Sequence, residues 1–318
     1  MYLVTGANGF LGRHLTAGLL AAHIDFVGAI RVLPDDFDRD SNLVAVDRID
    51  ENTNWSQILL DIDVVIHLAA RTCVVRGSDA AALRDVRCVN VEGTLNLARQ
   101  AAAAGVRRFV FVSSIKVNGE NTNGRPPFTE YDAPNPLDAY GISKLEAEIG
   151  LRELATSTGL EVVIIRPPLV YGAGVRANFL SLLKLADSRI PLPFSLVSNV
   201  RSMIYVENLV DFIILCCTHP KATSQTFLVA DQKSLSLAEL MTLIRTSMGR
   251  KTQLWPLPSF LFRLFGVILG KSKIVDRLVG NLEVDSSYAM KLLNWSPPFS
   301  VEQGIKVTVD AFIQGDRR

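Results

Sequence analysis

Short apolar runs alternate with longer amphipathic stretches through the first half of the chain. Several runs, such as Val64–Ile66 and Phe109–Val112, are continuously apolar, which is typical of parallel strands that helices cover on both faces. Because strands that alternate with helices build parallel sheets, this pattern predicts a doubly wound α/β fold. The predicted strands are Tyr2–Thr5, Phe26–Ile30, Leu43–Val46, Val64–Leu68, Phe109–Ser113 and Val162–Arg166, and the predicted helices are Phe10–Ala22, Trp55–Leu60, Ala80–Ala104 and Leu137–Thr158.

The pattern changes after Arg166, where prolines interrupt the chain and the connections become longer. The segment Thr226–Val229 has the composition of one more strand, so we expect the chain to return once to the first sheet. We therefore expect a first domain of residues 1–166 plus about 200–232, and a smaller C-terminal α/β lobe of residues 167–199 and 233–318. The predicted helices of this half are Val206–Cys217, Leu237–Met248 and Ser286–Leu293.

The 318 residues carry 33 basic and 32 acidic side chains, for a formal net charge of +1. This balance provides no general attraction to nucleic acid or to an anionic membrane, so an anionic ligand needs a local site. The most membrane-like segment, Phe260–Leu269, is shorter than the roughly 20 apolar residues that a spanning helix needs. We expect it to be a helix of the core or of the interface between the lobes.

The cysteines, Cys73, Cys88, Cys216 and Cys217, show no Cys-x-x-Cys spacing. We expect them to be reduced thiols, as in a cytoplasmic protein. The first residues lack a basic region followed by an apolar stretch, so no secretory signal is predicted. The histidines are scattered without the spacing of metal ligands, and we expect His67, on its apolar strand, to be a hydrogen-bonded core side chain.

A glycine-rich segment follows the first predicted strand and opens the first predicted helix. Gly6 permits a tight turn, Gly9 lets the backbone approach a pyrophosphate, and Gly12 lets the helix pack closely on the sheet. Their spacing, Gly-x-x-Gly-x-x-Gly, differs from the standard dinucleotide fingerprint. A turn with a close helix crossing needs the same glycines, but their position directly after the first strand favours a nucleotide site of the Rossmann type.

The end of the second strand distinguishes two nicotinamide cofactors. An acidic residue there binds the ribose 2′-hydroxyl of NAD, whereas an arginine accommodates the 2′-phosphate of NADP. This chain has Arg31, which favours NADP or tolerance of both cofactors, although a solvated arginine at a strand end is also common. Asp35 and Asp36 nearby would weaken phosphate binding or bind ribose instead.

A tyrosine and a lysine lie four residues apart near the start of a predicted helix. Tyr140 and Lys144 therefore share one helix face, with about 5–6 Å between their Cβ atoms. A free phenol has a pKa of about 10, and a nearby ammonium is expected to lower that pKa toward the range useful for proton transfer. Ser114 follows the strand Phe109–Ser113, at the sheet edge where ligands bind, and would donate a hydrogen bond to the same substrate oxygen.

Together these residues resemble the extended short-chain dehydrogenase/reductase superfamily, in its nucleotide-sugar epimerase, dehydratase and ketoreductase branch. The resemblance covers nearly the whole chain and implies that Ser114, Tyr140 and Lys144 are catalytic, with NAD or NADP as cofactor. The motifs that carry it are Thr5–Gly12, His67–Ala70, Asn90–Thr94, Val112–Ser114, Tyr140–Lys144 and Arg166–Gly172. The candidate cofactor-binding residues are Gly6, Asn8, Gly9, Phe10, Gly12, Arg31, Asp47, Leu68, Ala69, Ala70, Lys144 and Pro167.

Two residues of the second half are similar to ligands of a UDP-sugar diphosphate in this family. They are Arg201, whose guanidinium suits phosphate geometry, and Asn178; a surface arginine and a helix-capping asparagine are the simpler interpretations. Two positions depart from the family pattern, because Asn118 stands where a tyrosine is frequent and Lys116 stands where small residues are usual. Both are expected to face the substrate, which leaves the exact sugar open.

In its second half the chain resembles the UDP-N-acetyl-quinovosamine dehydrogenases, the 4-ketoreductases of O-antigen and lipopolysaccharide sugar synthesis. This resemblance implies an NAD(P)-dependent oxidoreductase that interconverts a UDP-2-acetamido-2,6-dideoxy-4-hexulose and the 4-hydroxy sugar. A UDP-sugar 4-epimerase with tightly bound NAD would use the same residues and is the first alternative. A non-enzymatic cofactor-binding regulator is the second, although the presence of Tyr140 and Lys144 argues against it. Family members are often dimers, which makes a homodimer a further expectation. The segments that carry the resemblance are Pro191–Phe194, Ser236–Leu240, Leu282–Asp285 and Leu293–Pro298.

Overall fold

Seven strands form one sheet in the computed structural model, which describes residues 1–33, 42–72, 80–188, 190–258, 261–262, 270 and 272–316. The strand order is β3-β2-β1-β4-β5-β6-β9, and every neighbouring pair is parallel. This is the order of a doubly wound sheet, so the predicted fold class is confirmed. The strands are β1 (Tyr2–Thr5), β2 (Phe26–Ile30), β3 (Leu43–Ala45), β4 (Val64–His67), β5 (Arg108–Val112), β6 (Glu161–Arg166) and β9 (Thr226–Leu228).

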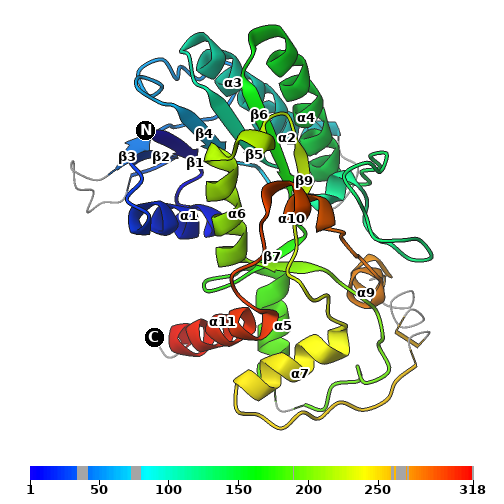
Figure 1. Ribbon diagram of the computed structural model, residues 1–318. Coiled ribbons are helices and arrows are strands. Elements are labelled where there is room, and N and C mark those ends of the chain that lie inside the picture. Colours follow the sequence, from blue (N-terminus) through cyan, green and yellow to red (C-terminus); the bar gives the residue numbers. More distant parts are fainter. Residues whose placement is uncertain are drawn as a thin grey trace.

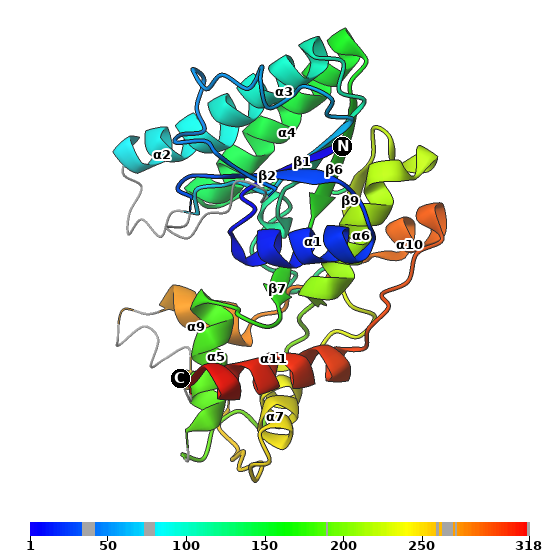
Figure 2. The ribbon, with the colours of Figure 1, turned by 90° about the vertical axis from the view of Figure 1, so that its left-hand side faces the viewer.

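Helices cover both faces of this sheet, as Figures 1 and 2 show. On one face α1 packs beside α6, and on the other face α3 packs beside α4. The side chains of β4 and β5 are therefore buried on both faces, which explains the continuously apolar runs Val64–Ile66 and Phe109–Val112 in these strands. The elements are α1 (Phe10–Ala21), α2 (Ala80–Arg87), the π-helical segment η1 (Cys88–Gly93), α3 (Thr94–Ala103), α4 (Ala139–Thr158) and α6 (Val206–Thr218).

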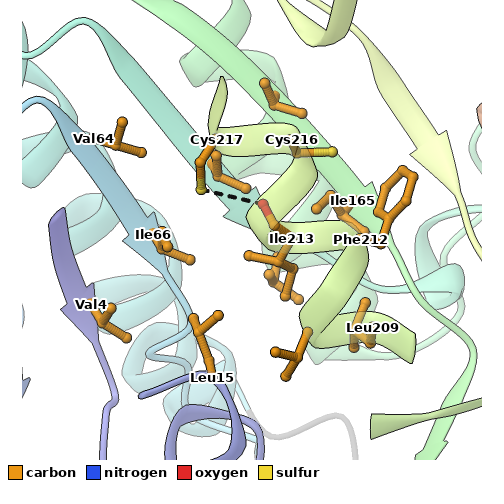
Figure 3. Packing of buried hydrophobic residues seen from close by; sticks show 14 of the residues in the cluster. Val4, Leu15, Val64, Ile66, Ile165, Leu209, Phe212, Ile213, Cys216 and Cys217 are labelled. Atoms are coloured by element: carbon orange, nitrogen blue, oxygen red, sulfur yellow. Dashed lines mark hydrogen bonds between the residues drawn. The ribbon is translucent and has the colours of Figure 1, made fainter. Parts of the chain in front are cut away.

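Buried side chains of β1, β4, β6 and α6 form one continuous cluster (Figure 3). Cys216 and Cys217 are free and fully buried in it, and the Cys217 thiol donates to the carbonyl oxygen of Ile213 at 3.2 Å. Burial raises the pKa of the Cys217 thiol to about 12. These two cysteines therefore act as reduced packing groups, as expected. Cys88 is also free, and Cys73 lies outside the described residues.

The prediction of a helix over Trp55–Leu60 is wrong, because the segment makes a single turn. The N–H of Leu59 donates to the carbonyl of Trp55 at 2.9 Å, but Asp61 then adopts a left-handed φ of 61° and ends the turn. The long helix predicted over Ala80–Ala104 is also divided, since α2, η1 and α3 follow one another there. The widened turns of η1 could not be read from the periodicity of the sequence.

The second half of the chain builds a group of helices below the sheet in Figure 2. Side chains of α5, α7 and α11, together with the short sheet of β7 and β8, form a second buried cluster, distinct from the first cluster of Figure 3. α10 lies in the range expected for the second lobe, yet its buried side chains join the first cluster; the expected domain boundaries stay a prediction. These elements are β7 (Leu169–Tyr171), α5 (Ala177–Asp187), β8 (Met203–Tyr205), η3 (Pro220–Ala222), α7 (Leu237–Ser247), α9 (Ser272–Val279), α10 (Ser287–Leu293) and α11 (Val301–Asp316).

No helix in the described ranges is long and apolar enough to cross a membrane.

Only two residues of the segment Phe260–Leu269 are described, Leu261 and Phe262, and both are helical. Phe262 packs against the second cluster, where its ring stacks on that of Phe194 at 5.7 Å between centroids. This contact agrees with the expectation of a core helix for the part that is described.

Candidate active site

The glycine-rich loop between β1 and α1 is folded tightly against the end of β4. Gly6 has a left-handed φ of +69°, and a Cβ there would lie 3.0 Å from the amide nitrogen of Ala69. A Cβ on Gly12 would lie 2.1 Å from the carbonyl oxygen of Gly6, so only glycine fits where α1 passes the loop. Gly9 is exposed at the N-cap of α1, whose first turn carries no acidic residue. The helix N-terminus therefore suits a pyrophosphate, and the loop fits a dinucleotide.

A buried chain of hydrogen bonds supports this loop from below. The N–H of Ala69 donates to Oγ1 of Thr5 at 3.2 Å, and the Thr5 hydroxyl donates to Nδ1 of His67 at 2.8 Å. Nε2 of His67 donates to Oγ1 of Thr94 at 2.9 Å, and Thr94 donates to the carbonyl of Asn90 at 2.8 Å. Only a neutral ring protonated at Nε2 completes this chain. Burial also lowers the pKa of His67 to about 3, which confirms the expected core histidine.

Asn90 joins the segment after β4 to the helix that carries the tyrosine. Its Oδ1 accepts from the N–H of Arg71 at 2.7 Å, and its Nδ2 donates to Oγ of Ser143 at 3.0 Å. Asn90 is completely buried. The sequence indicates Asn90 only as part of the motif Asn90–Thr94, although a buried asparagine in a helical segment needs such partners. Asn90 thus fixes the distance between α4 and the loop that follows β4.

The structure brings the predicted triad of Ser114, Tyr140 and Lys144 together at one edge of the sheet. Ser114 directly follows β5 and is the N-cap of the short helix η2 (Ile115–Val117). Nζ of Lys144 donates to the carbonyl oxygen of Val112 at 2.9 Å, two residues before the serine. The same Nζ lies 5.9 Å from the centre of the Tyr140 ring. The lysine therefore lies between the end of the strand and the phenol.

α4 begins at Ala139, two residues later than predicted, because Asp138 caps it. The carboxylate Oδ1 of Asp138 accepts from the N–H of Gly141 at 2.8 Å. An N-cap of this kind satisfies a free N–H group of the first turn and fixes where the helix starts. It places Tyr140 in the first turn and Lys144 one turn further along the same face.

Burial controls the protonation of both residues. Burial lowers the pKa of Lys144 to about 7, and the nearby carboxylate of Glu148 opposes this change. Burial, and then the charge of Asp138, raise the pKa of Tyr140 to about 12. The expectation that the ammonium lowers the pKa of the phenol is therefore wrong for this structure, because the cost of desolvating the phenolate is larger. At neutral pH Tyr140 is a protonated phenol that can donate its proton.

A buried network of charged and polar side chains connects α4 to the ends of β5 and β6. Oε1 of Glu148 accepts from Oγ of Ser113 at 2.6 Å and from Nε of Arg166 at 2.9 Å. Nη1 of Arg166 donates to Oδ1 of Asn118 at 2.9 Å, and Asn118 is only 1% exposed. The expectation that Asn118 faces the substrate is therefore wrong, since this network holds its amide. These hydrogen bonds fix the side chains of three residues near Lys144, namely Glu148, Arg166 and Asn118.

The other candidate cofactor residues lie at the ends of neighbouring strands. Since β2, β1 and β4 are adjacent, the segments that follow them share one edge of the sheet. Pro167, after β6, is buried, and its carbonyl accepts from the N–H of Ile115 at 3.0 Å. Asp35 and Asp36 lie outside the described residues. Exposed candidates are Asn8, Arg31 and Asp47, and partly buried ones are Phe10, Leu68, Ala69 and Ala70.

The candidate diphosphate ligands belong to the part of the chain that packs around the second cluster. Asn178 is exposed in the first turn of α5. Arg201 is partly buried, its Nη1 donates to the carbonyl of Gly280 at 3.0 Å, and its backbone pairs with Leu235 and Leu282. Their role toward a diphosphate stays a prediction. In the described part of the chain no group of three histidine, cysteine or acidic side chains is arranged to hold a metal.

Comparisons with known proteins agree with this geometry. The model of the NAD dependent epimerase/dehydratase family matches residues 2–230. The UDP-glucose 4-epimerase of Vibrio cholerae is 44% identical over 317 residues, which are 99% of this chain and 96% of that protein. The UDP-glucuronic acid 4-epimerase of Bacillus cereus, solved with NAD, has a TM-score of 0.77 at 23% identity, with 98% of each chain covered. The UDP-glucose 4-epimerase of Thermotoga maritima, solved with UDP-glucose, has a TM-score of 0.76 at 23% identity, with 99% of each chain covered.

Proposed function

The chain belongs to the NAD dependent epimerase/dehydratase family, and from this premise we propose that it is a UDP-sugar 4-epimerase that retains NAD. The observation that carries the proposal is the 44% identity to a UDP-glucose 4-epimerase over 99% of the chain. Identity of this extent includes both the sheet with its glycine loop and the second group of helices. It therefore supports a shared reaction type more directly than the short segments that resemble the quinovosamine ketoreductases.

The residues of the triad have separate tasks in this reaction. Tyr140 exchanges a proton with the 4-hydroxyl of the sugar, and the glycine loop binds the pyrophosphate of the cofactor. Oγ of Ser114 accepts from the N–H of Lys116 at 3.3 Å, which leaves the serine proton available for the same sugar oxygen. Lys144, anchored on Val112, places its amino group beside the phenol, and with a pKa of about 7 this group can be charged or neutral near neutral pH. A bound nicotinamide supplies the hydride acceptor and donor for C4.

The second lobe holds the UDP-sugar in this proposal. Arg201 and Asn178 would bind the diphosphate, and residues 167–199 and 233–318 would form most of the pocket walls. This arrangement places C4 of the sugar at the sheet edge where Tyr140 lies, since ligands bind at the carboxyl ends of parallel strands. A homodimer and a cytoplasmic location stay predictions.

The ketoreductase expected first from the sequence is the second candidate. The comparisons support the epimerase better, because the relatives reported above are 4-epimerases. Exposed Arg31 after β2 is the observation that keeps the reductase in consideration, since it suits an exchangeable NADP. An epimerase needs no added cofactor, whereas a reductase consumes one cofactor for each sugar, so a single assay separates the two.

The test is incubation of the purified protein with UDP-glucose or UDP-N-acetylglucosamine and no added nicotinamide cofactor. Proton NMR distinguishes the C4 epimers, because the coupling of the sugar proton at C4 differs between them. We expect the corresponding galactose-type sugar to appear until equilibrium is reached. A second sample receives NADPH and a UDP-4-keto-6-deoxy sugar, and here we expect no stoichiometric loss of NADPH absorbance.

Tyr140→Phe is the matched control for this assay. It removes one hydroxyl from the site, so we expect turnover to disappear while the cofactor content of the purified protein stays at the wild-type level. Loss of NADPH with a keto sugar, combined with no epimer from either UDP-sugar, would replace the epimerase by the ketoreductase. Undiminished turnover in Tyr140→Phe would remove the role assigned to the tyrosine.

A further inference from the structure

The backbone of Lys116 contacts Ser114 of the triad and lies against the helical turn that carries Tyr140. Its N–H donates to Oγ of Ser114 at 3.3 Å. Its carbonyl oxygen packs against the first turn of α4, where a Cβ on Gly141 would lie 2.9 Å away. Gly141 therefore permits η2 to approach the turn that carries Tyr140. Through these contacts the peptide of Lys116 links the serine loop to the tyrosine helix.

The side chain of Lys116 reaches the same turn of α4. Its Nζ forms ion pairs with Asp138, the cap of α4, and with Glu120 at 3.4 Å. The same Nζ lies 6.0 Å from the centre of the Tyr140 ring, almost the 5.9 Å of Lys144. Tyr140 thus has two lysine amino groups at similar distances, one from its own helix and one from η2.

The charges around Tyr140 come from three elements. Lys144 belongs to α4, Asp138 stands at its N-terminus, and Lys116 approaches from η2 with Glu120 beside it. The carboxylate of Asp138 raises the pKa of Tyr140, after the larger effect of burial. The ammonium of Lys116 is paired with that carboxylate, so it opposes the effect of the carboxylate on the phenol.

We propose that the side chain of Lys116 is a positioning group of the active site: its ion pair with Asp138 holds η2, which Ser114 caps, against the turn that carries Tyr140, and it neutralises Asp138 beside the phenol. The proposal rests on the proposed function, because it gives Ser114 and Tyr140 a common substrate oxygen. Lys116 acts through these two residues and is not itself assigned to the substrate. A half-exposed ion pair without such a role contributes little to stability and nothing to the chemistry, so kinetics and tyrosine ionisation distinguish the two.

The experiment compares Lys116→Met and Lys116→Arg with wild type. Arg250→Met is the control, since Arg250 pairs with Asp187 in a comparably exposed ion pair on the second group of helices. Steady-state epimerisation measures kcat and KM for each variant. A second readout requires no reaction: NMR of isotope-labelled tyrosine rings follows ionisation of the six tyrosines with pH, and Tyr140→Phe assigns the signal.

For Lys116→Met we expect kcat to fall about tenfold with KM changed less than about twofold, because positioning acts on the transition state. Lys116→Arg should restore kcat. Because a guanidinium keeps its charge at the pH where the phenol ionises, this variant should also move the onset of Tyr140 ionisation down by about one pH unit. Asp138→Asn, which keeps an oxygen for the cap, should move the onset down. Arg250→Met should match wild type in every measurement.

Wild-type kcat in Lys116→Met would overturn the proposal, and so would an unchanged onset of Tyr140 ionisation in Lys116→Arg. Equal effects of Lys116→Met and Arg250→Met would overturn it too, since they would show a general loss of stability. If Lys116→Met does not fold, Lys116→Arg and Asp138→Asn carry the same test with the charge pattern retained or changed. If the onset moves as expected but no UDP-sugar is epimerised, the proposed function fails while the placement of Lys116 stands.

Discussion

The buried ammonium of Lys144 makes the stability of the protein depend on pH, and one variant isolates this effect. Lys144 is 1% exposed, and burial lowers its pKa from the ordinary 10.5 to about 7. A difference of this size corresponds to about 5 kcal/mol between the charged and neutral forms. Lys144→Met keeps most of the apolar stem and removes the titrating group, so the difference between the two proteins reports this lysine alone.

The sign of the effect follows from the two pKa values. Below pH 7 the lysine is charged in both the folded and the unfolded chain, so the folded state bears the full cost of burying it. Between pH 7 and pH 10.5 the unfolded chain binds more protons than the folded protein, and the free energy of unfolding rises with pH. Above pH 10.5 both forms are neutral and the cost has vanished.

Urea unfolding of both proteins between pH 6 and pH 10.5 measures this difference. At the acid end we expect Lys144→Met to be more stable by about 4 kcal/mol, since loss of the hydrogen bond to Val112 offsets about 1 kcal/mol of the gain. At the alkaline end we expect Lys144→Met to be less stable by about 1 kcal/mol, because only the loss of the hydrogen bond remains. A difference that stays constant with pH would contradict this prediction, because it would mean that Lys144 titrates alike in both states.

Three further predictions concern the loop, the ionic network and the cofactor. Gly12→Ala should lose bound dinucleotide, because its Cβ would lie 2.1 Å from a carbonyl oxygen of the loop. The absorbance of cofactor released on denaturation measures the dinucleotide content. Gly315→Ala, where a Cβ meets nothing within 4 Å, should retain the dinucleotide. Glu148→Gln should lower the free energy of unfolding by about 3–5 kcal/mol, since it leaves a buried guanidinium without its partner. Glu146→Gln, at a half-exposed pair on the same helix, should cost about 1 kcal/mol or less in the same urea titration, and equal losses would contradict the burial argument. Arg31→Ala should weaken NADP binding about fivefold and leave NAD binding unchanged in fluorescence titrations; a similar loss for both would show that Arg31 does not read the 2′-phosphate.

The strands of the first domain could be predicted because their burial is complete. Val64–His67 and Arg108–Val112 are buried along their whole length, so their apolar runs in the sequence carry a clear signal. The return of the chain at Thr226–Leu228 could be predicted because two of its three residues are buried, and this strand pairs with β6. The proximity of Tyr140 and Lys144 could be predicted because both lie on one helix, where spacing alone defines their relation.

Features that depend on contacts far apart in the sequence could not be predicted. Asn90 bonds to Arg71 and Ser143, which approach it only after the sheet and α4 have packed. The ionisation of Tyr140 was predicted with the wrong sign, because spacing shows the nearby ammonium but not the burial that dominates. The single turn at Trp55–Leu60 has helical composition, yet its end depends on the backbone of one residue.

A substrate labelled at C4 shows whether the protein is a UDP-sugar 4-epimerase that retains NAD. UDP-glucose with deuterium at C4 is incubated with the protein in ordinary water, with no cofactor added, and the galactose-type product is analysed by mass spectrometry and NMR. We expect the product to keep its deuterium at C4, because the same hydride equivalent leaves and returns within one site. Loss of the deuterium to solvent, or the absence of any C4 epimer from both UDP-glucose and UDP-N-acetylglucosamine, would contradict it.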